Sequence, residues 1–177
     1  MSPASRLSRA IEAACDTAAL IAGLLLLVVV VLTVANVTGF ALDRVTQSAG
    51  VRVRGLPGYE DAVAMLVGSA ATLMLPLCQL KRGHVAVDTV VALAPLAVRR
   101  AILQLCDVLF ACVAGLLALA LVYGALDAAT FGTLTPVLGW QVWPFFVPAI
   151  IGCALWSFTA AAMAAGLIST GALDDRA

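Results

Sequence analysis

The stretch VLFACVAGLLALALVYGAL, residues 108–126, is an unbroken apolar run that lies between Asp107 and Asp127. About 20 residues of α-helix cross a hydrocarbon layer of about 30 Å, so this run has the length of one transmembrane helix. A run of the same length lies between Asp61 and Lys81. Strands of membrane barrels need only about 9–11 residues of alternating character, so both runs favour helices over strands.

Two longer apolar segments, near the two ends of the chain, complete the pattern. We expect transmembrane helices at about residues 17–42, 60–80, 98–127 and 140–168. The 177 residues are 63% hydrophobic and 11% charged, whereas a soluble domain carries about 25% charged residues. The sequence therefore predicts an all-α integral membrane protein, folded as a single membrane domain over residues 1–177. Its net charge of zero gives no basic surface for nucleic acid.

The connection between the second and third expected helices contains KRGHVAVD, residues 81–88, with the only histidine of the chain. Gly83 can adopt the left-handed conformation that ends a helix. Beyond it, apolar residues recur at helical spacing on one face, namely Val87, Val90, Val91 and Ala94. His84 and Asp88 lie together along the flank of that face. The pattern predicts a short interfacial amphipathic helix at about residues 84–94.

Lysines and arginines are distributed unequally between the two sides of the expected membrane segment. Seven of the ten lie in the N-terminal tail, the middle connection and the C-terminal tail, whereas three lie in the first connection. Cationic residues favour the cytoplasmic side, so we expect both termini in the cytoplasm. The residues expected at headgroup depth are Lys81, Arg82, His84, Asp88, Arg99, Arg100, Trp140 and Trp143.

Ionisable groups inside transmembrane helices are costly and therefore usually functional, but the expected helices contain few of them. Asn36 is the main deep polar residue, and we expect it to form an interhelical hydrogen bond or to mark a helix end. Asp107 shares a helix face with Arg100 and Gln104, so we expect it to pair at the interface. His84 is the only histidine, whereas a metal site needs three or four ligands. We therefore predict no catalytic, substrate-binding or metal-binding residues and no cofactor in this chain.

Two features fit both a structural role and contact with a partner. Glu60 and Asp61 open the second helix, where the helix dipole favours acidic side chains and where a partner protein could also bind them. Pairs of small residues four apart let helix backbones approach closely, and these pairs are Gly68/Thr72, Ala111/Gly115 and Ala162/Gly166. Such faces fit packing within the chain and packing against another membrane protein equally well. Taken with the scarcity of ionisable groups, they indicate a subunit rather than a catalyst.

The order of these features is similar to that of a known family. The acidic pair opens the second helix, and an Arg-Gly-His-Val-x-Val-Asp stretch, residues 82–88, follows that helix. The remaining landmarks, in order, are Pro95, Arg100, a Gly- and Thr-containing loop at residues 131–139, and Trp140, Trp143 and Pro144. Over roughly residues 15–168, the chain resembles the small membrane subunit, DctQ type, of tripartite ATP-independent periplasmic (TRAP) transporters.

This resemblance implies a small permease subunit of a heteromeric complex in the bacterial inner membrane, without enzyme activity of its own. In such transporters a large multi-helix subunit carries the substrate and sodium sites and moves as an elevator. A soluble periplasmic binding protein delivers an organic anion, often a carboxylate, for symport. The small subunit packs on the large one and enlarges its static scaffold, so sodium is expected in the partner and not in this chain.

The resemblance also implies which surfaces contact the two partners. For the large subunit, we expect contacts from Glu60, Asp61, Gly68 and Thr72. For the binding protein, we expect charge-dependent docking at Arg44, Arg52 and Arg54 in the first outer connection. This connection departs from the family pattern because it is long and rich in arginine.

Two other classes of membrane protein also fit four helices. One is the membrane anchor of a redox complex that binds haem or quinone, although a bis-histidine haem needs a second histidine. The other is a small homodimeric exporter. Such exporters usually need a carboxylate embedded in the membrane, whereas the acidic residues of this chain lie near the helix ends.

Overall fold

The computed structural model describes residues 3–46, 55–82 and 95–168 of the chain. Its helices are α1 (Pro3–Thr46), α2 (Tyr59–Leu80), α4 (Leu96–Thr130) and α5 (Trp143–Ala164). All four are long and apolar enough to cross a membrane, which confirms the prediction of an all-helical chain with four helices of membrane-spanning length among the described residues. At 1.5 Å per residue, the 22 residues of α2 and of α5 span about 33 Å, close to the thickness of a hydrocarbon layer.

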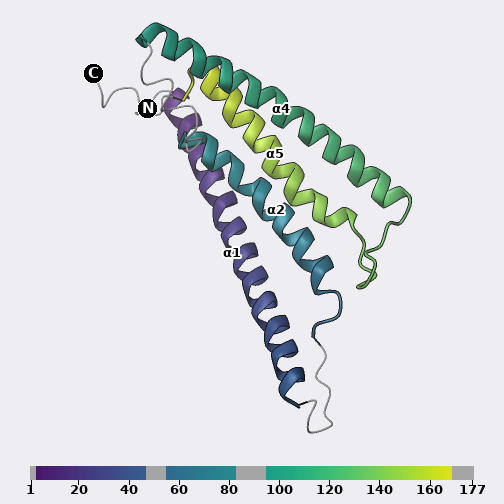
Figure 1. The fold of residues 1–177 in the computed structure, drawn as a ribbon. Helices are drawn as coiled ribbons and strands as arrows, with labels where there is room; N and C mark the ends of the chain where they lie inside the picture. Colours follow the sequence, from purple (N-terminus) through teal and green to yellow (C-terminus); the bar gives the residue numbers. More distant parts are fainter. Residues whose placement is uncertain (1–2, 47–54, 83–94, 169–177) are drawn as a thin grey trace.

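The helices lie side by side in one layer, in the spatial order α1, α2, α5, α4 (Figure 1). α5 is last in the sequence, yet it packs between α2 and α4. The central helices α2 and α5 are therefore more buried than the edge helices α1 and α4. Because an edge helix has a neighbour along one side only, large apolar side chains stay exposed on it, such as Leu20, Leu24 and Val31 of α1.

The two central helices approach each other closely because small residues line their contact. A Cβ atom on Gly152 of α5 would lie 2.6 Å from the carbonyl carbon of Thr72 in α2, so the site has no room for a side chain. Pro76 has no N–H and leaves the Thr72 carbonyl without its intrahelical donor. Nearby, the Ser69 hydroxyl donates a hydrogen bond of 3.1 Å to the Phe145 carbonyl. Close backbone contact and an interhelical hydrogen bond thus join α2 to α5.

α1 begins earlier than the expected helix at residues 17–42, because its first turns also pack against other helices. Ile11 and Cys15 are buried in a cluster with residues from the ends of α2 and α5, namely Leu80, Ala162 and Met163, and with Ile168, which follows α5. The next turns of α1 contribute to a second cluster, which contains Ala18, Ala22, Ala70 and Leu73. Both clusters lie in the first half of α1, so this half carries the main apolar contact with α2.

α5 is shorter than the expected helix at residues 140–168. Trp140 belongs to the preceding loop, where its amide donates a hydrogen bond of 3.0 Å to the Thr135 hydroxyl oxygen. At the other end, Gly166 has a φ of 69°, and its amide donates to a carbonyl of the last turn. This left-handed turn is a common helix C-cap. Gly166 therefore ends α5 and does not form a small-residue helix face with Ala162.

The connection between α2 and α4 lies largely outside the described residues. The interfacial helix expected at residues 84–94 falls in this part of the chain, so it stays a prediction. α2 ends at Leu80, and Lys81 is its C-cap residue. α4 begins directly after Pro95. This agrees with the rule that the residue before a proline rarely adopts the helical conformation.

Candidate functional site

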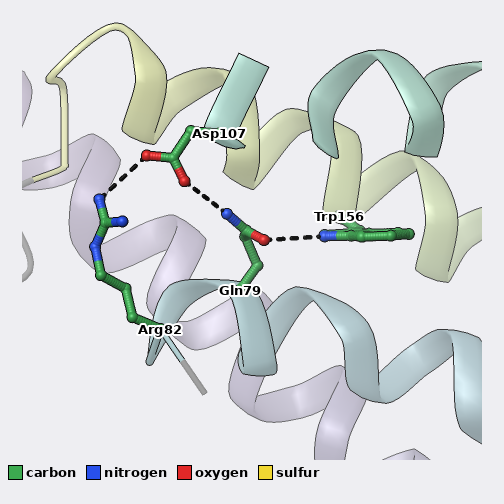
Figure 2. A network of polar contacts seen from close by, with 4 residues as sticks. All are labelled: Gln79, Arg82, Asp107 and Trp156. Carbon is green, nitrogen blue, oxygen red and sulfur yellow. Dashed lines mark hydrogen bonds and ion pairs between the residues drawn. The ribbon is translucent and has the colours of Figure 1, made fainter. Parts of the chain in front are cut away.

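A network of four side chains joins α2, α4 and α5 at the end of the layer where α2 stops (Figure 2). Asp107 of α4 lies at its centre and is 2% exposed. One carboxylate oxygen accepts a hydrogen bond of 2.8 Å from the Gln79 amide, and the other forms an ion pair of 3.1 Å with Arg82. The side-chain oxygen of Gln79, Oε1, accepts a hydrogen bond of 3.3 Å from the Trp156 indole. One chain of polar contacts therefore connects three helices.

The network places a carboxylate inside a membrane helix without leaving it unpaired. An isolated charge in a medium of low dielectric constant would be strongly destabilised, but both Asp107 oxygens have donors. Arg82 is 22% exposed, so its guanidinium links the buried carboxylate to the polar surface. On the other side, Phe110 packs against Trp156 with ring centroids 5.9 Å apart. Because its groups bind one another, the network is suited to holding helices together.

Arg82 has an unusual backbone conformation. Its φ of 48° lies in the left-handed region, which costs a non-glycine residue roughly 1–2 kcal/mol. The Arg82 amide donates a hydrogen bond of 3.0 Å to the Gln79 carbonyl oxygen of the backbone, which stabilises the turn. The same turn brings the guanidinium to Asp107 (Figure 2). The left-handed turn therefore places Arg82 for the ion pair.

Asp107 has partners different from those expected. Its position in the sequence suggested pairing with Arg100 and Gln104 of the same helix, but its donors are Gln79 and Arg82. Residues at i, i+4 and i+7 share a helix face, which brings them near each other along α4. The donors Gln79, in the last turn of α2, and Arg82, just beyond that helix, instead reach Asp107 from a different helix (Figure 2).

Sequence reasoning did not identify Gln79 and Trp156 as members of a site. One signal was available for Gln79, because Gln79 and Asp107 both lie near the expected inner ends of their helices and so at similar depth. No comparable signal marks Trp156, which lies in the interior of α5. Its contact with Gln79 depends on α5 packing beside α2, and hydropathy does not encode that order.

At the opposite end of the layer, Asp61 binds the loop between α4 and α5. Its Oδ2 atom accepts hydrogen bonds from the backbone amides of Val137 at 2.9 Å and Leu138 at 3.2 Å. Glu60, the other member of the acidic pair, is exposed in the first turn of α2. The Asp61 carboxylate thus has a role within the chain, whereas Glu60 lies on the surface.

Asn36 holds the connection between α1 and α2. It is buried, and its Oδ1 atom accepts a hydrogen bond of 3.0 Å from the Leu56 amide. Gly55 lies against it, since a Cβ atom there would be 2.7 Å from that oxygen. Thr33, one turn earlier, forms a hydrogen bond of 3.1 Å with the Tyr59 hydroxyl. The deep polar residue of α1 therefore binds the backbone of the connection, rather than a side chain of another helix.

The small-residue face of α2 lines an open groove. The groove has a volume of about 390 Å³, lies over α5, and is lined on the α2 side by Ala64, Gly68 and Thr72. A Cβ atom on Gly68 would meet nothing within 4 Å. By contrast, a Cβ atom on Gly115 of α4 would lie 3.2 Å from the Ser157 hydroxyl of α5. The Gly115 face packs within the chain, whereas the Gly68 face is left uncovered by the described residues.

The remaining residues named from the sequence lie near helix ends or outside the described part of the chain. Those near helix ends are Arg44 of α1, Lys81 after α2, Arg99 and Arg100 of α4, and Trp140 and Trp143 around the start of α5. Those outside the described residues are Arg52, Arg54, His84 and Asp88.

Comparison with known proteins assigns the chain to a family. The model of the family described as tripartite ATP-independent periplasmic transporters, DctQ component, matches residues 49–170. The match includes α2, α4 and α5, and thus all members of the polar network and the residues around the groove. No curated protein and no solved structure matches the chain. Because the family match covers well over half of the sequence, the chain belongs to the DctQ family and is the small membrane component of a TRAP transporter.

Proposed function

We propose that this chain is a scaffold for the large permease subunit of a sodium-coupled transporter of organic anions, with carboxylates as the expected substrates. The supporting observation is that the main buried polar side chains of the described residues bind other parts of the same chain. The Nε atom of Arg99 is an exception, since it is buried without a hydrogen-bond partner among those residues. Asp107 and Gln79 bind each other and two further side chains, and Asn36 binds a connection. A transport site needs polar groups that bind and release a substrate, whereas these groups hold helices in fixed positions. The substrate and sodium sites are therefore assigned to the large subunit.

The groove over α5 is the proposed contact with the large subunit. Its α2 wall carries Gly68 and Thr72, and small residues let a helix of another protein approach closely. Asp61 is a weaker candidate than the sequence suggested, because its carboxylate is bonded to the loop between α4 and α5. Glu60 is exposed and keeps its place in the proposed interface.

Co-purification with the large subunit tests this interface. A bulky side chain in the groove would block a docked helix, so we expect Gly68→Leu to reduce recovery of the large subunit. Gly23→Leu on α1 is the matched control, since a Cβ atom at Gly23 also meets nothing within 4 Å. It should leave recovery unchanged. Full recovery of the large subunit with Gly68→Leu would assign the interface to another face.

We further propose an inner-membrane location with both termini in the cytoplasm and residues 1–177 as one membrane domain. In this orientation the exposed Arg44, in the last turn of α1, lies at the periplasmic side.

Together with Arg52 and Arg54, Arg44 is proposed to dock the periplasmic binding protein through charge complementarity. Replacing the three arginines with glutamate should reduce uptake in reconstituted vesicles without reducing membrane insertion. Unchanged uptake at low ionic strength would exclude this docking site.

A further inference from the structure

The loop between α4 and α5, residues 131–142, has an unusual distribution of polar and apolar groups. Phe131 is 81% exposed and Val137 is 62% exposed. Leu134 and Trp140 are exposed as well. The polar Thr135 is buried, and residues 131–142 contain no charged residue. Thr133 and Gln141 are exposed, as polar side chains usually are. The unusual feature is therefore the set of large apolar side chains left exposed, since a loop in water would bury most of them.

The backbone amides of this loop are largely bonded within the protein. Hydrogen bonds within the loop run from the amides of Thr135 and Val142 to the carbonyls of Trp140 and Thr133, and from the Gly139 amide to the Thr135 carbonyl. The Trp140 amide donates to the Thr135 hydroxyl oxygen. Outside the loop, the Asp61 carboxylate accepts two further amides, those of Val137 and Leu138. Backbone groups bonded in this way do not depend on water, which is what a lipid environment requires.

The position of the loop matches the edge of the membrane. Its bonds to Asp61 hold it over the first turn of α2, and a Cβ atom on Gly58 would clash with the Leu138 side chain. Trp140 stacks on Phe145 of α5, with ring centroids 6.3 Å apart. The amphipathic ring of tryptophan favours the level of the lipid headgroups. The loop therefore lies at the depth where a helix leaves the hydrocarbon layer.

The exposed apolar surface of the loop also continues that of α4. Leu119, Tyr123 and Leu126 are exposed along one side of α4, and Phe131 follows directly after the helix. This edge helix has a neighbour on one side only, so its free side has the apolar character that acyl chains cover. Continuity with this surface favours lipid as the neighbour of the loop, rather than water or a soluble protein.

We propose that residues 131–142 form a lipid-embedded hairpin that lies at the boundary between headgroups and acyl chains, with Phe131, Leu134 and Val137 inserted among the lipids. The inference rests on the proposed function in one respect only: the proposed orientation of the chain places this hairpin in the periplasmic leaflet.

Fluorescence quenching in the assembled transporter tests the depth of the loop. The probe is an environment-sensitive bimane label on Val137→Cys, in a chain whose five native cysteines are replaced by alanine. The complex is reconstituted with the large subunit in vesicles of phosphatidylethanolamine and phosphatidylglycerol. Phe131→Cys serves as a second labelled position if Val137→Cys prevents assembly. Glu12→Cys, on the exposed polar face at the start of α1, is the control in water.

We expect loss of emission with a lipid that carries a nitroxide near its headgroup and no loss with aqueous iodide, with the reverse result for Glu12→Cys. Quenching of the loop label by iodide alone would overturn the proposal and place the loop in water. Resistance to both quenchers would also overturn it and place the loop under a protein partner. Co-purification and uptake by the labelled complex report on the proposed function independently, so its failure is distinguishable from that of the hairpin.

Discussion

At the scale of single residues, Asp107 shows how the chain accommodates a carboxylate between membrane helices. Gln79 and Arg82 donate to its two oxygens, and Trp156 donates to Gln79 from the opposite side. Replacing a whole buried ion pair with apolar residues often leaves stability unchanged, whereas removing one partner leaves the other unpaired. We infer that the main effect of the network is to specify how α2, α4 and α5 pack against one another. Its contribution to the total stability is smaller.

We expect Asp107→Ala to lower the unfolding temperature of the detergent-solubilised chain, because Gln79 and Arg82 lose their acceptor. Leaving a buried polar group without its partner costs about 1–3 kcal/mol. Asp107→Asn keeps an oxygen that can accept from one of the donors, so its effect should be smaller. Thermal unfolding followed by tryptophan fluorescence measures both variants. An unfolding temperature of Asp107→Ala equal to that of the wild type would contradict this role.

Asp61 and Glu60 form a natural pair for a second test at this scale. Asp61→Ala removes the acceptor of the Val137 and Leu138 amides, so these amides should exchange with solvent deuterium faster. Glu60→Ala changes an exposed carboxylate in the same helical turn and should leave their exchange unchanged. Hydrogen exchange followed by mass spectrometry of peptides from the α4–α5 loop provides the measurement. Equal exchange in the two variants would show that Asp61 does not hold the loop.

At the scale of helices, the contact between α2 and α5 depends on Gly152. A Cβ atom there would lie 2.6 Å from both the carbonyl carbon and the oxygen of Thr72, and 2.8 Å from the Leu73 nitrogen. These are backbone atoms, which cannot turn aside as the end of a flexible side chain can. A larger residue must therefore push the two helices apart.

Gly152→Ala should destabilise the chain by about 1–3 kcal/mol, the usual cost of inserting atoms into a packed contact. Gly23→Ala makes the same change in α1, where a Cβ atom meets nothing within 4 Å, and should cause no loss. Thermal unfolding in one detergent compares the two variants. If Gly152→Ala unfolds at the temperature of Gly23→Ala, the close approach of α2 and α5 is wrong.

The four helices were predictable from the sequence because their signals are local. The charged residues that bracket 62–80 and 108–126 mark where each helix leaves the lipid. The polar network was not predictable in the same way, because its members come from three helices and meet only when α5 packs between α2 and α4. The ends of α5 were misplaced for a related reason. An apolar loop and a C-cap glycine look like helix when hydropathy alone is read.

At the scale of the whole molecule, the one-layer arrangement limits burial to the lines where neighbouring helices touch (Figure 1). Many large apolar side chains consequently stay exposed, from Leu20 on α1 to Leu126 on α4. Lipid can cover such a surface, and so can a larger membrane protein. A single layer presents more surface per residue than a closed bundle does, which fits the proposed scaffold role.

The order of the helices can be tested by disulfide cross-linking in the cysteine-free background described above. The Cβ position of Gly115 lies 3.2 Å from the Ser157 hydroxyl, so Gly115→Cys with Ser157→Cys should form a disulfide between α4 and α5. Gly23→Cys with Gly115→Cys joins the two edge helices and should remain reduced. Mass spectrometry of the linked peptides identifies each product.

The control pair carries the stronger part of this prediction, because it distinguishes a layer from a bundle. In a layer, α2 and α5 separate the edge helices α1 and α4, and a disulfide between these edges would require the layer to curl until they met. A bundle of that kind would also close the groove beside Gly68 and cover the apolar faces of α1 and α4. A disulfide between Gly23→Cys and Gly115→Cys in the assembled transporter would therefore contradict the layer order. It would also contradict the proposed binding site for the large subunit.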